Sequence, residues 1–406
     1  MQRTILHCDM NNFFASVECL KAPHLRDVPM AVCGDVEARH GVVLAKNEKA
    51  KALGIITGET VYSAKQKCPS LVTVVPHHGE YAEFSRKAFE IYSRFTDEIE
   101  PFGMDECWLD VTGSLRLFGS GEQIADRIRG IIKEELGLTA SVGVSFNKVF
   151  AKLGSDMKKP DATTVISYEN FKERVWCLPA SEMLGVGKAT AKKLSSLGIH
   201  TIGEIAARPR EYYENLFGKI GVQIWKNACG LDDSPVVYRE PDGLDKSCGH
   251  GSTTRHDLNT PDEVWRLMLE LSQQIGHKLY KHRKKASGVA ISIRDNRLVT
   301  KQWQCKIRTP SASPSVIAKE AFDLFCRSYG WSHPIRSVTV TAIDLVEWDT
   351  PLQLEMFGDA ESDKRTETLD KTIEEIRAKY GKNSIKNAVL IDGKGRKNER
   401  NDKKSD

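Results

Sequence analysis

The order of hydrophobic and polar positions in the first 166 residues predicts strands that alternate with helices. Residues 4–9 alternate as a strand does, and the following residues carry Phe13, Val17 and Leu20 at helical spacing. Further elements are expected as a strand at 30–33, helices at 46–53, 80–96 and 121–136, strands around 101–110 and a strand at 139–145. This order is typical of an α/β architecture, in which residues 21–75 form a small insertion.

The second half of the chain predicts a helical segment and then a βαββαβ module. Residues 178–206 predict two short helices around Gly185 and Gly187, which permit a tight turn, and the helix starting near Lys188 offers free amides to a phosphate. Residues 232–245, rich in Asp and Pro, predict a linker. The module after it is expected as strand 249–257, helix 262–284, strands 288–295 and 300–308, helix 314–330 and strand 335–345.

Within this module, strand 300–308 separates two kinds of side chain. Trp303, Cys305 and Ile307 point to one face of the expected sheet. The side chains that point to the other face are polar or basic, namely Gln302, Gln304, Lys306 and Arg308. One face therefore packs on helices, and the other is suited to a nucleic-acid backbone.

Charge is distributed unevenly along the chain. There are 59 Lys and Arg against 55 Asp and Glu, for a net charge of +4. Residues 246–346 alone hold 16 basic and 8 acidic residues, so the rest of the chain is net acidic by four charges. A basic module joined to an acidic one predicts a polyanionic ligand that the first holds and the second processes.

Length and composition limit the class of protein. With 406 residues the chain has room for two to four domains. No apolar run approaches the ~18 residues that cross a membrane, and the N-terminus lacks a signal-peptide pattern. The ten cysteines contain no C-x-x-C pair, so neither a zinc finger nor a disulfide framework is supported. These features predict a reduced, cytoplasmic protein with no membrane partner.

Two acidic clusters lie inside apolar sequence, Asp9 at the end of residues 4–9 and Asp105 with Glu106 inside residues 101–110. Apolar surroundings disfavour ionised carboxylates unless a cation compensates them. Lys and Arg are scarce beside both clusters, so we expect a divalent metal, and oxygen ligands favour Mg²⁺. The alternative is structural carboxylates that cap turns or pair with lysines. Strict alternation would send Asp105 and Glu106 to opposite faces, so a shared site requires a hairpin tip or a bulge.

Five segments in order resemble the Y-family DNA polymerases of the DNA polymerase IV (DinB-like) branch. Residues 9–18 and 104–112 resemble the two metal motifs of that family. The remaining matches are the palm segment at 144–152 with 158–160, the hairpin at 185–187 and the start of the basic module at 246–250. Because the matches run from residue 4 to about residue 346, the resemblance covers most of the chain.

The resemblance implies a multidomain right-hand polymerase. The expected parts are a palm at 1–20 and 76–166, small fingers at 21–75, a helix-hairpin-helix thumb at 167–232, a linker at 233–245, a βαββαβ little finger at 246–346 and a tail at 347–406. The implied activity is low-fidelity, template-directed DNA synthesis by two-metal nucleotidyl transfer, for translesion synthesis in DNA repair. Its implied substrates are primer–template DNA and deoxynucleoside triphosphates, and a monomer is expected.

Residue by residue, the resemblance assigns the following roles. Asp9, Asp105 and Glu106 would hold two Mg²⁺ ions, with the Met10 carbonyl as a further ligand. Phe14, next to Phe13, matches a steric gate that rejects the ribose 2′-hydroxyl; the alternative is a core aromatic. Lys51 and Lys159 match two contacts with the triphosphate. Three further residues match contacts with the DNA backbone, namely Gly185, Gly187 and Lys188. For Lys51 and Lys159 the alternative is solvated surface residues, and for the hairpin it is an ordinary interhelical turn.

Two positions depart from the family pattern. Asn11 replaces a frequent aspartate, which puts little at risk because the family uses the neighbouring backbone. Glu48 stands where a phosphate-contacting tyrosine is usual. A carboxylate beside a triphosphate should repel it, so we expect a weaker affinity for nucleotides or a shifted loop.

Residues 353–357 near the end resemble the pentapeptide that binds the ring-shaped sliding clamp. Gln353 would supply amide hydrogen bonds, and Leu354, Met356 and Phe357 would fill an apolar groove. A helix is expected at 366–380, followed by a basic end. Two competing functions remain open, a nucleotidyl cyclase with a similar palm and a clamp-tethered DNA-binding scaffold with a degenerate site.

Overall fold

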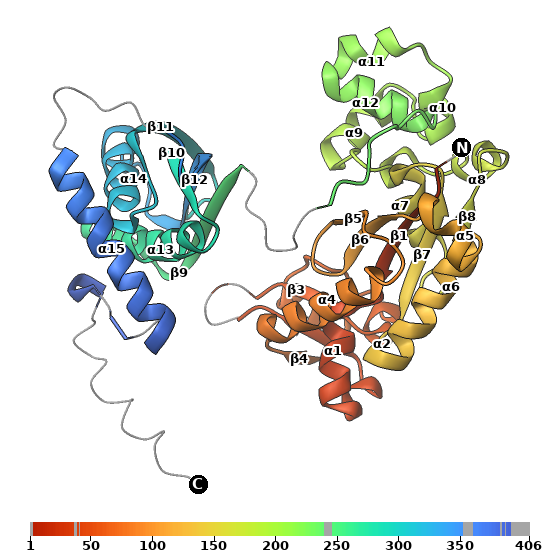
Figure 1. Ribbon diagram of the computed structural model, residues 1–406, viewed down its shortest axis with the longest axis horizontal. Coiled ribbons are helices and arrows are strands. Elements are labelled where there is room, and N and C mark those ends of the chain that lie inside the picture. Colours follow the sequence, from red (N-terminus) through yellow and green to blue (C-terminus); the bar gives the residue numbers. More distant parts are fainter. Residues whose placement is uncertain are drawn as a thin grey trace. The chain divides into compact units, whose positions relative to one another are not determined.

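The computed structural model describes residues 3–35, 39, 41–238, 246–351, 360–381, 384–385 and 387–390. Contacts divide the chain into two compact units, residues 1–36 with 41–241 and residues 37–40 with 242–406 (Figure 1). Each unit has its own hydrophobic core. The units are described separately below.

A five-stranded sheet forms the centre of the first unit, in the order β5-β6-β1-β7-β8. The strands are β1 (Ile5–Met10), β5 (Ile99–Pro101), β6 (Glu106–Asp110), β7 (Ala140–Ser145) and β8 (Thr163–Ile166). β1 is antiparallel to both neighbours, and only β7 and β8 are parallel. Antiparallel pairing therefore places Asp9, near the carboxyl end of β1, beside the amino end of β6.

Helices cover both faces of this sheet, which explains why all six residues of β1 are buried. Leu6, Cys8 and Met10 face a core that includes side chains of α4 (His78–Tyr92) and α6 (Gly121–Ile131). Ile5 and His7 face α7 (Lys148–Met157) on the other side. α7 lies very close to β7, since a Cβ atom on Gly143 would be 1.8 Å from the carbonyl oxygen of Ala151. Only glycine permits this approach.

A smaller sheet, in the order β3-β2-β4, follows α1 (Phe13–Lys21) in the first unit. Its strands are β2 (Met30–Cys33), β3 (Val43–Lys46) and β4 (Val72–Val74), and it carries α2 (Glu48–Ala52) and α3 (Val61–Lys67). Asn47 caps α2 by accepting a hydrogen bond from the Ala50 amide. The expected insertion thus has a small core of its own.

The helical segment that follows is built from α8 (Phe171–Val175), α9 (Lys188–Ser196), α10 (Ile202–Ala206), α11 (Arg210–Phe217) and α12 (Lys219–Ala228). The expectation of two α-helices around Gly185 is only half right. The segment before the turn forms just one 3₁₀ turn, Ala180–Glu182, and the chain is already extended at Met183. Pro179 precedes that turn and fixes its entry, which leaves too few residues for an α-helix.

The first half of the expected linker packs on the first unit. Arg3 donates to the carbonyl oxygens of Ser234 (2.9 Å) and Asp232 (3.3 Å). The Val237 amide donates to Glu100 Oε2 at 3.0 Å, and Val236 is buried. Residues 232–238 are therefore ordered against the sheet and its helices.

The second unit has the expected order of elements, around a sheet arranged β11-β10-β12-β9. These elements are β9 (Ser247–Leu258), α13 (Pro261–Lys281), β10 (Lys284–Asp295), β11 (Thr300–Ser311), α14 (Pro314–Ser328) and β12 (Ile335–Glu347). The βαββαβ prediction is confirmed, but its first helix ends three residues early. Arg283 adopts a left-handed conformation (φ 50°), so the basic run at 281–285 is divided between helix, turn and strand.

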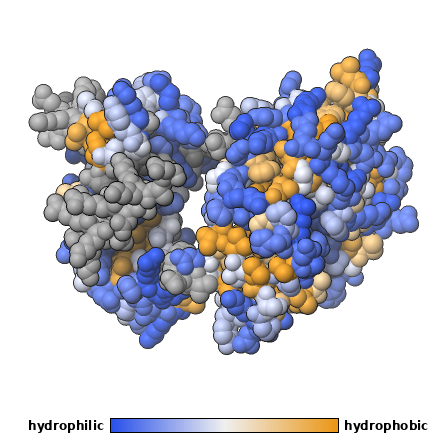
Figure 2. Space-filling model, turned by 90° about the horizontal axis from the view of Figure 1, so that it is seen from below, coloured by the Kyte–Doolittle hydropathy of each residue, from blue (hydrophilic) through white to orange (hydrophobic). Residues whose placement is uncertain are grey.

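A further helix, α15 (Ala360–Tyr380), packs on α13. Asp370 accepts a hydrogen bond from the Ser313 hydroxyl, and Glu374 lies 2.8 Å from His277 Nδ1. The helix expected at 366–380 is thus present and begins earlier. Hydrophilic side chains cover much of the described surface (Figure 2). Among the described residues, no helix is both long and apolar enough to cross a membrane.

Candidate active site

Three carboxylates meet at one end of β1 and β6. Asp9 pairs directly with Glu106 across the two strands, so their side chains leave the same face of the sheet. Asp105 precedes β6 and closes the turn of the β5–β6 hairpin, where its carbonyl oxygen accepts a hydrogen bond from the Met10 amide at 3.1 Å. The expected hairpin tip is confirmed, and this turn releases Asp105 from strict alternation.

Two lysines contact these carboxylates, which corrects the expectation that cations are scarce there. Lys159 Nζ lies 2.6 Å from Asp9 Oδ2, and Lys152 Nζ lies 2.5 Å from Glu106 Oε2. Both lysines are far from the acids in sequence, so composition beside the acids could not reveal them. The alternative of acids paired with lysines therefore describes part of the site.

The pKa values show that the lysines compensate the acids unequally. Burial, together with repulsion by Glu106 and Asp105, raises the pKa of Asp9 to about 6 despite its contact with Lys159. Burial also raises the pKa of Asp105, and repulsion from Glu106 adds to it. For Glu106, burial acts in the same direction, but His7 and Lys152 outweigh it and hold the pKa at about 2. The lysines thus stabilise the ionised form of Glu106 more than that of Asp9 or Asp105.

His7 lies behind Glu106 and is fully buried. Its Nδ1 is 2.8 Å from Ser155 Oγ, and the Ser155 hydroxyl donates to the Lys152 carbonyl. His7 Nε2 faces Glu106 Oε2, 3.3 Å away, and which of the two nitrogens carries the proton of a neutral ring depends on the tautomer. Burial lowers the pKa of His7, which favours this neutral form. Lys152 is consequently the main counter-ion of Glu106.

The donor set fits a divalent ion of the magnesium type. No group of three or more His, Cys, Asp and Glu side chains in the described part of the chain has a ready-made metal-binding arrangement. This agrees with the contacts, because Asp9 and Glu106 are each turned toward a lysine. Three carboxylates face two ammonium groups, which leaves excess negative charge among oxygen-only donors. Hard divalent cations prefer such donors.

Aromatic side chains of α1 and α4 pack against one another. Phe14 stacks on Tyr81 with ring centroids 4.2 Å apart, and it meets the His78 ring edge-on at 5.9 Å. Phe14 is only partly buried, whereas Phe13 is 3% exposed and belongs to the core. Phe13 therefore supports the neighbouring ring from within the core.

Glu48 is engaged by neighbouring side chains. Its Oε1 accepts a hydrogen bond from Asn12 Nδ2 at 2.7 Å and lies 3.7 Å from Lys51 Nζ. Asn12 itself has a left-handed conformation at the start of α1 (φ 49°). The two contacts answer part of the question raised by Glu48, because the Lys51 ammonium balances its charge and the Asn12 amide donates a hydrogen bond to it. The Lys51 side chain remains 48% exposed.

The remaining expected contacts lie elsewhere. Gly185, Gly187 and Lys188 are exposed at the turn before α9, and Gly185 has a positive φ of 91° that favours glycine. In the second unit, Gln302, Gln304, Lys306 and Arg308 are exposed on β11 as expected. The expected clamp-binding residues Gln353, Leu354, Met356 and Phe357 lie outside the described residues.

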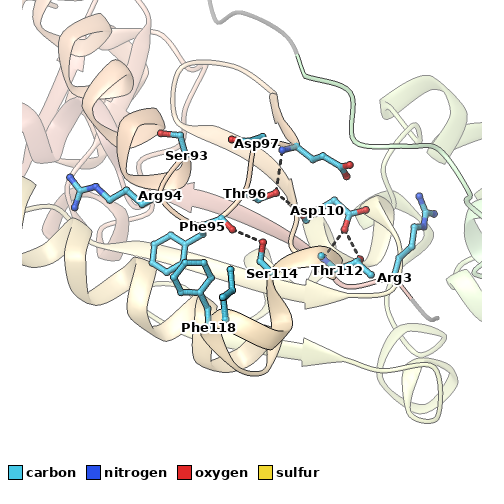
Figure 3. Close-up of a pocket in the computed structure, with 13 residues that line it drawn as sticks. Arg3, Ser93, Arg94, Phe95, Thr96, Asp97, Asp110, Thr112, Ser114 and Phe118 are labelled. Atoms are coloured by element: carbon cyan, nitrogen blue, oxygen red, sulfur yellow. Dashed lines mark hydrogen bonds between the residues drawn. The ribbon is translucent and has the colours of Figure 1, made fainter.

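The largest pocket that we describe is separate from the carboxylates. It has a volume of about 660 Å³ and lies at the far end of β6, near Asp110, whereas Glu106 begins that strand (Figure 3). Its two arginines already have partners, since Arg3 binds Ser234 and Asp232, and Arg94 forms a double hydrogen bond with Glu135. The pocket therefore offers little unpaired positive charge to an anionic substrate.

Sequence reasoning missed three residues of the site: Lys152, His7 and Asp156. Lys152 lies within the segment that resembles the palm, one helical turn after Lys148, which was a usable signal. His7 shares the face of β1 that carries Asp9. Asp156 contacts Lys159 at 2.8 Å, and no pattern in the sequence pointed to it.

Comparisons with known proteins agree with this geometry. Residues 8–156 match the impB/mucB/samB family, and residues 245–356 match the C-terminal domain of that family. The DNA polymerase IV of Acetivibrio thermocellus is 47% identical over 97% of this chain and 99% of its own length. The DNA polymerase IV 1 of Bacillus subtilis is 36% identical over 96% of this chain and 93% of its own.

A solved structure shares the fold. A Y-family DNA polymerase chimera superposes with a TM-score of 0.76 and 23% identity, covering 85% of this chain and 99% of the other. The two family matches cover most of the two sheets of the first unit and the βαββαβ module of the second. The chain therefore belongs to the impB/mucB/samB family, and within it to the Y-family DNA polymerases of the DNA polymerase IV type.

Proposed function

We propose that this protein is a DNA-directed DNA polymerase that extends a primer by two-metal nucleotidyl transfer. The observation that carries the proposal is the pairing of Asp9 with Glu106 across β1 and β6, with Asp105 in the adjoining turn. Relatives that are 36–47% identical over nearly the whole chain are named DNA polymerase IV. We assign residues 1–20 and 76–166 to the palm, 21–75 to the fingers, 167–232 to the thumb and 246–346 to the little finger.

Two Mg²⁺ ions are proposed to bind Asp9, Asp105 and Glu106, with the Met10 carbonyl as a further ligand. When bound, such ions lower the pKa of an attacking hydroxyl and neutralise phosphate charge. The chain's own contribution is to position the carboxylates that would hold the ions. Strand pairing fixes Asp9 against Glu106, and the Met10 amide fixes the Asp105 backbone. Little covalent work is left to the protein in such a transfer, so this positioning dominates.

We propose that Phe14 is the steric gate beside the sugar of the incoming nucleotide. Its ring is held by the stack on Tyr81, and Tyr81 is fixed in turn by a hydrogen bond of 2.5 Å to the buried Glu18. A ring held this way cannot swing aside at low cost, which is what exclusion of a 2′-hydroxyl requires. Lys51 and Lys159 are proposed to contact the triphosphate. The Asn12–Glu48 contact keeps the carboxylate of Glu48 engaged, which limits its repulsion of the nucleotide.

DNA is proposed to lie on the open face of the second unit's sheet. Small residues occupy much of this face, and they pair across the strands in two rows: Gly249, Thr341, Ala290 and Gln304 in one, and Gly251, Thr339, Ser292 and Gln302 in the other. Small side chains allow a phosphate backbone to approach the strands closely, while Lys306 and Arg308 supply charge. The turn at Gly185, Gly187 and Lys188 is proposed as a second contact with the backbone.

Low fidelity and lesion bypass follow from the proposed fingers, which are built on short strands of three or four residues and two short helices. Such a small domain covers a nascent base pair loosely. We further propose a monomeric, cytoplasmic enzyme that is recruited by a sliding clamp through Gln353, Leu354, Met356 and Phe357. The clamp assignment is based on sequence alone, because these residues lie outside the described ones.

Primer extension separates this proposal from the two alternatives. The protein should extend a primed template with Mg²⁺ and deoxynucleotides, on undamaged and abasic templates alike. Asp105→Ala should abolish extension and retain DNA binding. Product formation without DNA would indicate a cyclase, and wild-type DNA binding without extension would indicate the scaffold. The basic second unit and the exposed hairpin turn argue against the cyclase.

A further inference from the structure

Lys159 lies between two carboxylates that differ in exposure. Its Nζ is 2.6 Å from Asp9 Oδ2 and 2.8 Å from Asp156 Oδ1. The Asp9 side chain is 8% exposed and belongs to the proposed metal site, whereas the Asp156 side chain is 50% exposed and lies on α7. The amine therefore has one partner inside the site and one at its edge.

An ammonium group and a divalent cation compete for Asp9. Lys159 occupies one carboxylate oxygen by a direct hydrogen bond, and its charge repels a metal ion approaching the other. Mg²⁺ binds at about 2.0–2.1 Å and requires well-placed oxygen ligands. A carboxylate held by a lysine therefore binds a metal ion less well than a free one.

Lys152 contacts Glu106 in the same manner but is held more firmly. It lies within the body of α7, its side chain is 17% exposed, and its Nζ lies 5.4 Å from the centre of the Phe102 ring. Lys159 lies beyond the end of that helix at Met157, and its side chain is 27% exposed. Of the two lysines, Lys159 is therefore the more exposed to solvent.

We propose that Lys159 exchanges partners when a metal-bound nucleotide enters the site. In the metal-free protein it neutralises Asp9, with Asp156 as its second contact. When the nucleotide and its metal bind, Lys159 leaves Asp9 for the triphosphate, and Lys152 stays on Glu106. Metal binding and nucleotide binding are thereby coupled through one side chain. This inference rests on the proposed metal site and adds Asp156 as a positioning residue for Lys159.

The exchange predicts that one substitution has opposite effects in two binding measurements. Without nucleotide, Lys159→Gln removes a competitor, so Mn²⁺ alone should bind about fivefold more tightly. With nucleotide, the same substitution removes a triphosphate contact, so the Mn²⁺–nucleotide complex should bind about fivefold less tightly. If Lys159 only stabilised the fold, its replacement would change the two affinities in the same direction.

The experiment uses the full-length protein and electron paramagnetic resonance of free Mn²⁺. Titrations are made with Mn²⁺ alone and with a deoxynucleotide whose α,β-bridge cannot be cleaved, in the absence of DNA. Lys152→Gln is the matched comparison: it also frees a metal-binding carboxylate but removes no triphosphate contact, so it should not weaken binding of the Mn²⁺–nucleotide complex. Asp156→Asn removes the second partner of Lys159, which strengthens its hold on Asp9. This variant should bind Mn²⁺ alone about twofold more weakly.

Each outcome has one consequence. Effects of the same sign in both titrations of Lys159→Gln overturn the exchange, as does an unchanged affinity of Asp156→Asn for Mn²⁺. A loss of nucleotide affinity in Lys152→Gln equal to that in Lys159→Gln also overturns it. If the unaltered protein binds no Mn²⁺ in either titration, the proposed metal site itself is wrong, which is a separate failure.

Discussion

Replacement of Lys152 by methionine tests how the site is stabilised without metal. Lys152 Nζ lies 2.5 Å from Glu106 Oε2, and the two side chains are 17% and 23% exposed. Methionine retains an unbranched chain beside Phe102 and loses only the charge. The variant leaves a largely buried carboxylate without its main counter-ion, which is destabilising.

The magnitude follows from the pKa of Glu106. Burial opposes its ionisation, but His7 and Lys152 hold the pKa at about 2 instead of 4.5, and a difference of this size corresponds to roughly 3 kcal/mol. Since the lowered pKa of His7 favours its neutral form, Lys152 supplies the ionic share of the favourable part, and its removal costs less than the whole shift. We therefore expect Lys152→Met to lower the free energy of unfolding by about 2 kcal/mol at neutral pH without metal.

The pH dependence has a definite sign. The pKa of Glu106 is lower in the folded protein than its ordinary value of 4.5, so the stabilisation is complete above that value and is lost as the pH falls toward 2. The difference between the two proteins should therefore be largest near neutral pH and shrink as the pH falls from about 5 toward 2.

Urea unfolding in EDTA, followed by tryptophan fluorescence, measures this difference. Lys148→Met is the matched control. Lys148 lies on the same helix as Lys152, is similarly buried, and pairs with Glu100 at 2.6 Å. Added Mg²⁺ should restore part of the stability lost in Lys152→Met, since a cation again compensates Glu106, and should not restore Lys148→Met. Equal responses of the two variants to Mg²⁺ would refute the reasoning.

Three further predictions address the substrates and partners. Phe14→Val should admit ribonucleotides, measured as the ratio of extension with deoxy- and ribonucleotides; an unchanged ratio would show that Phe14 is not the gate. DNA affinity should fall about tenfold or more between 50 and 200 mM salt, because each phosphate contact releases a counter-ion; a flat response in a binding titration contradicts the role given to residues 246–346. Replacing Gln353 and Phe357 by alanine should shorten products only when the clamp is present, and an equal loss without clamp rejects that assignment.

The sequence by itself determined the features that depend on local periodicity. Alternation along residues 4–9 placed β1 within one residue, and the order of the second unit's elements was correct. The need for a turn at Asp105 also followed from strand geometry alone, because two neighbouring strand residues cannot face the same way. These features follow from the repeat of two residues in a strand and of 3.6 residues in a helix. A short stretch of chain is long enough to show either repeat.

The ends of elements were less accurate for a related reason. The basic run at 281–285 is polar throughout, so no hydrophobic position marks where α13 stops and β10 starts. The left-handed turn at Arg283 decides that boundary. Likewise, nothing in the composition of residues 232–238 indicated that Val236 would be buried against the first unit. Such boundaries and burial depend on contacts with parts of the fold that are distant in sequence.

Only the tertiary structure decided how the acids are neutralised. Lys159 reaches Asp9 across 150 residues, and Lys152 reaches Glu106 across 46. Both contacts require α7 to lie against β1 and β7, an approach that the absence of a side chain at Gly143 permits. Charge compensation acts through space over a few ångströms, so it is set by which elements pack together. Neighbours in sequence do not reveal it.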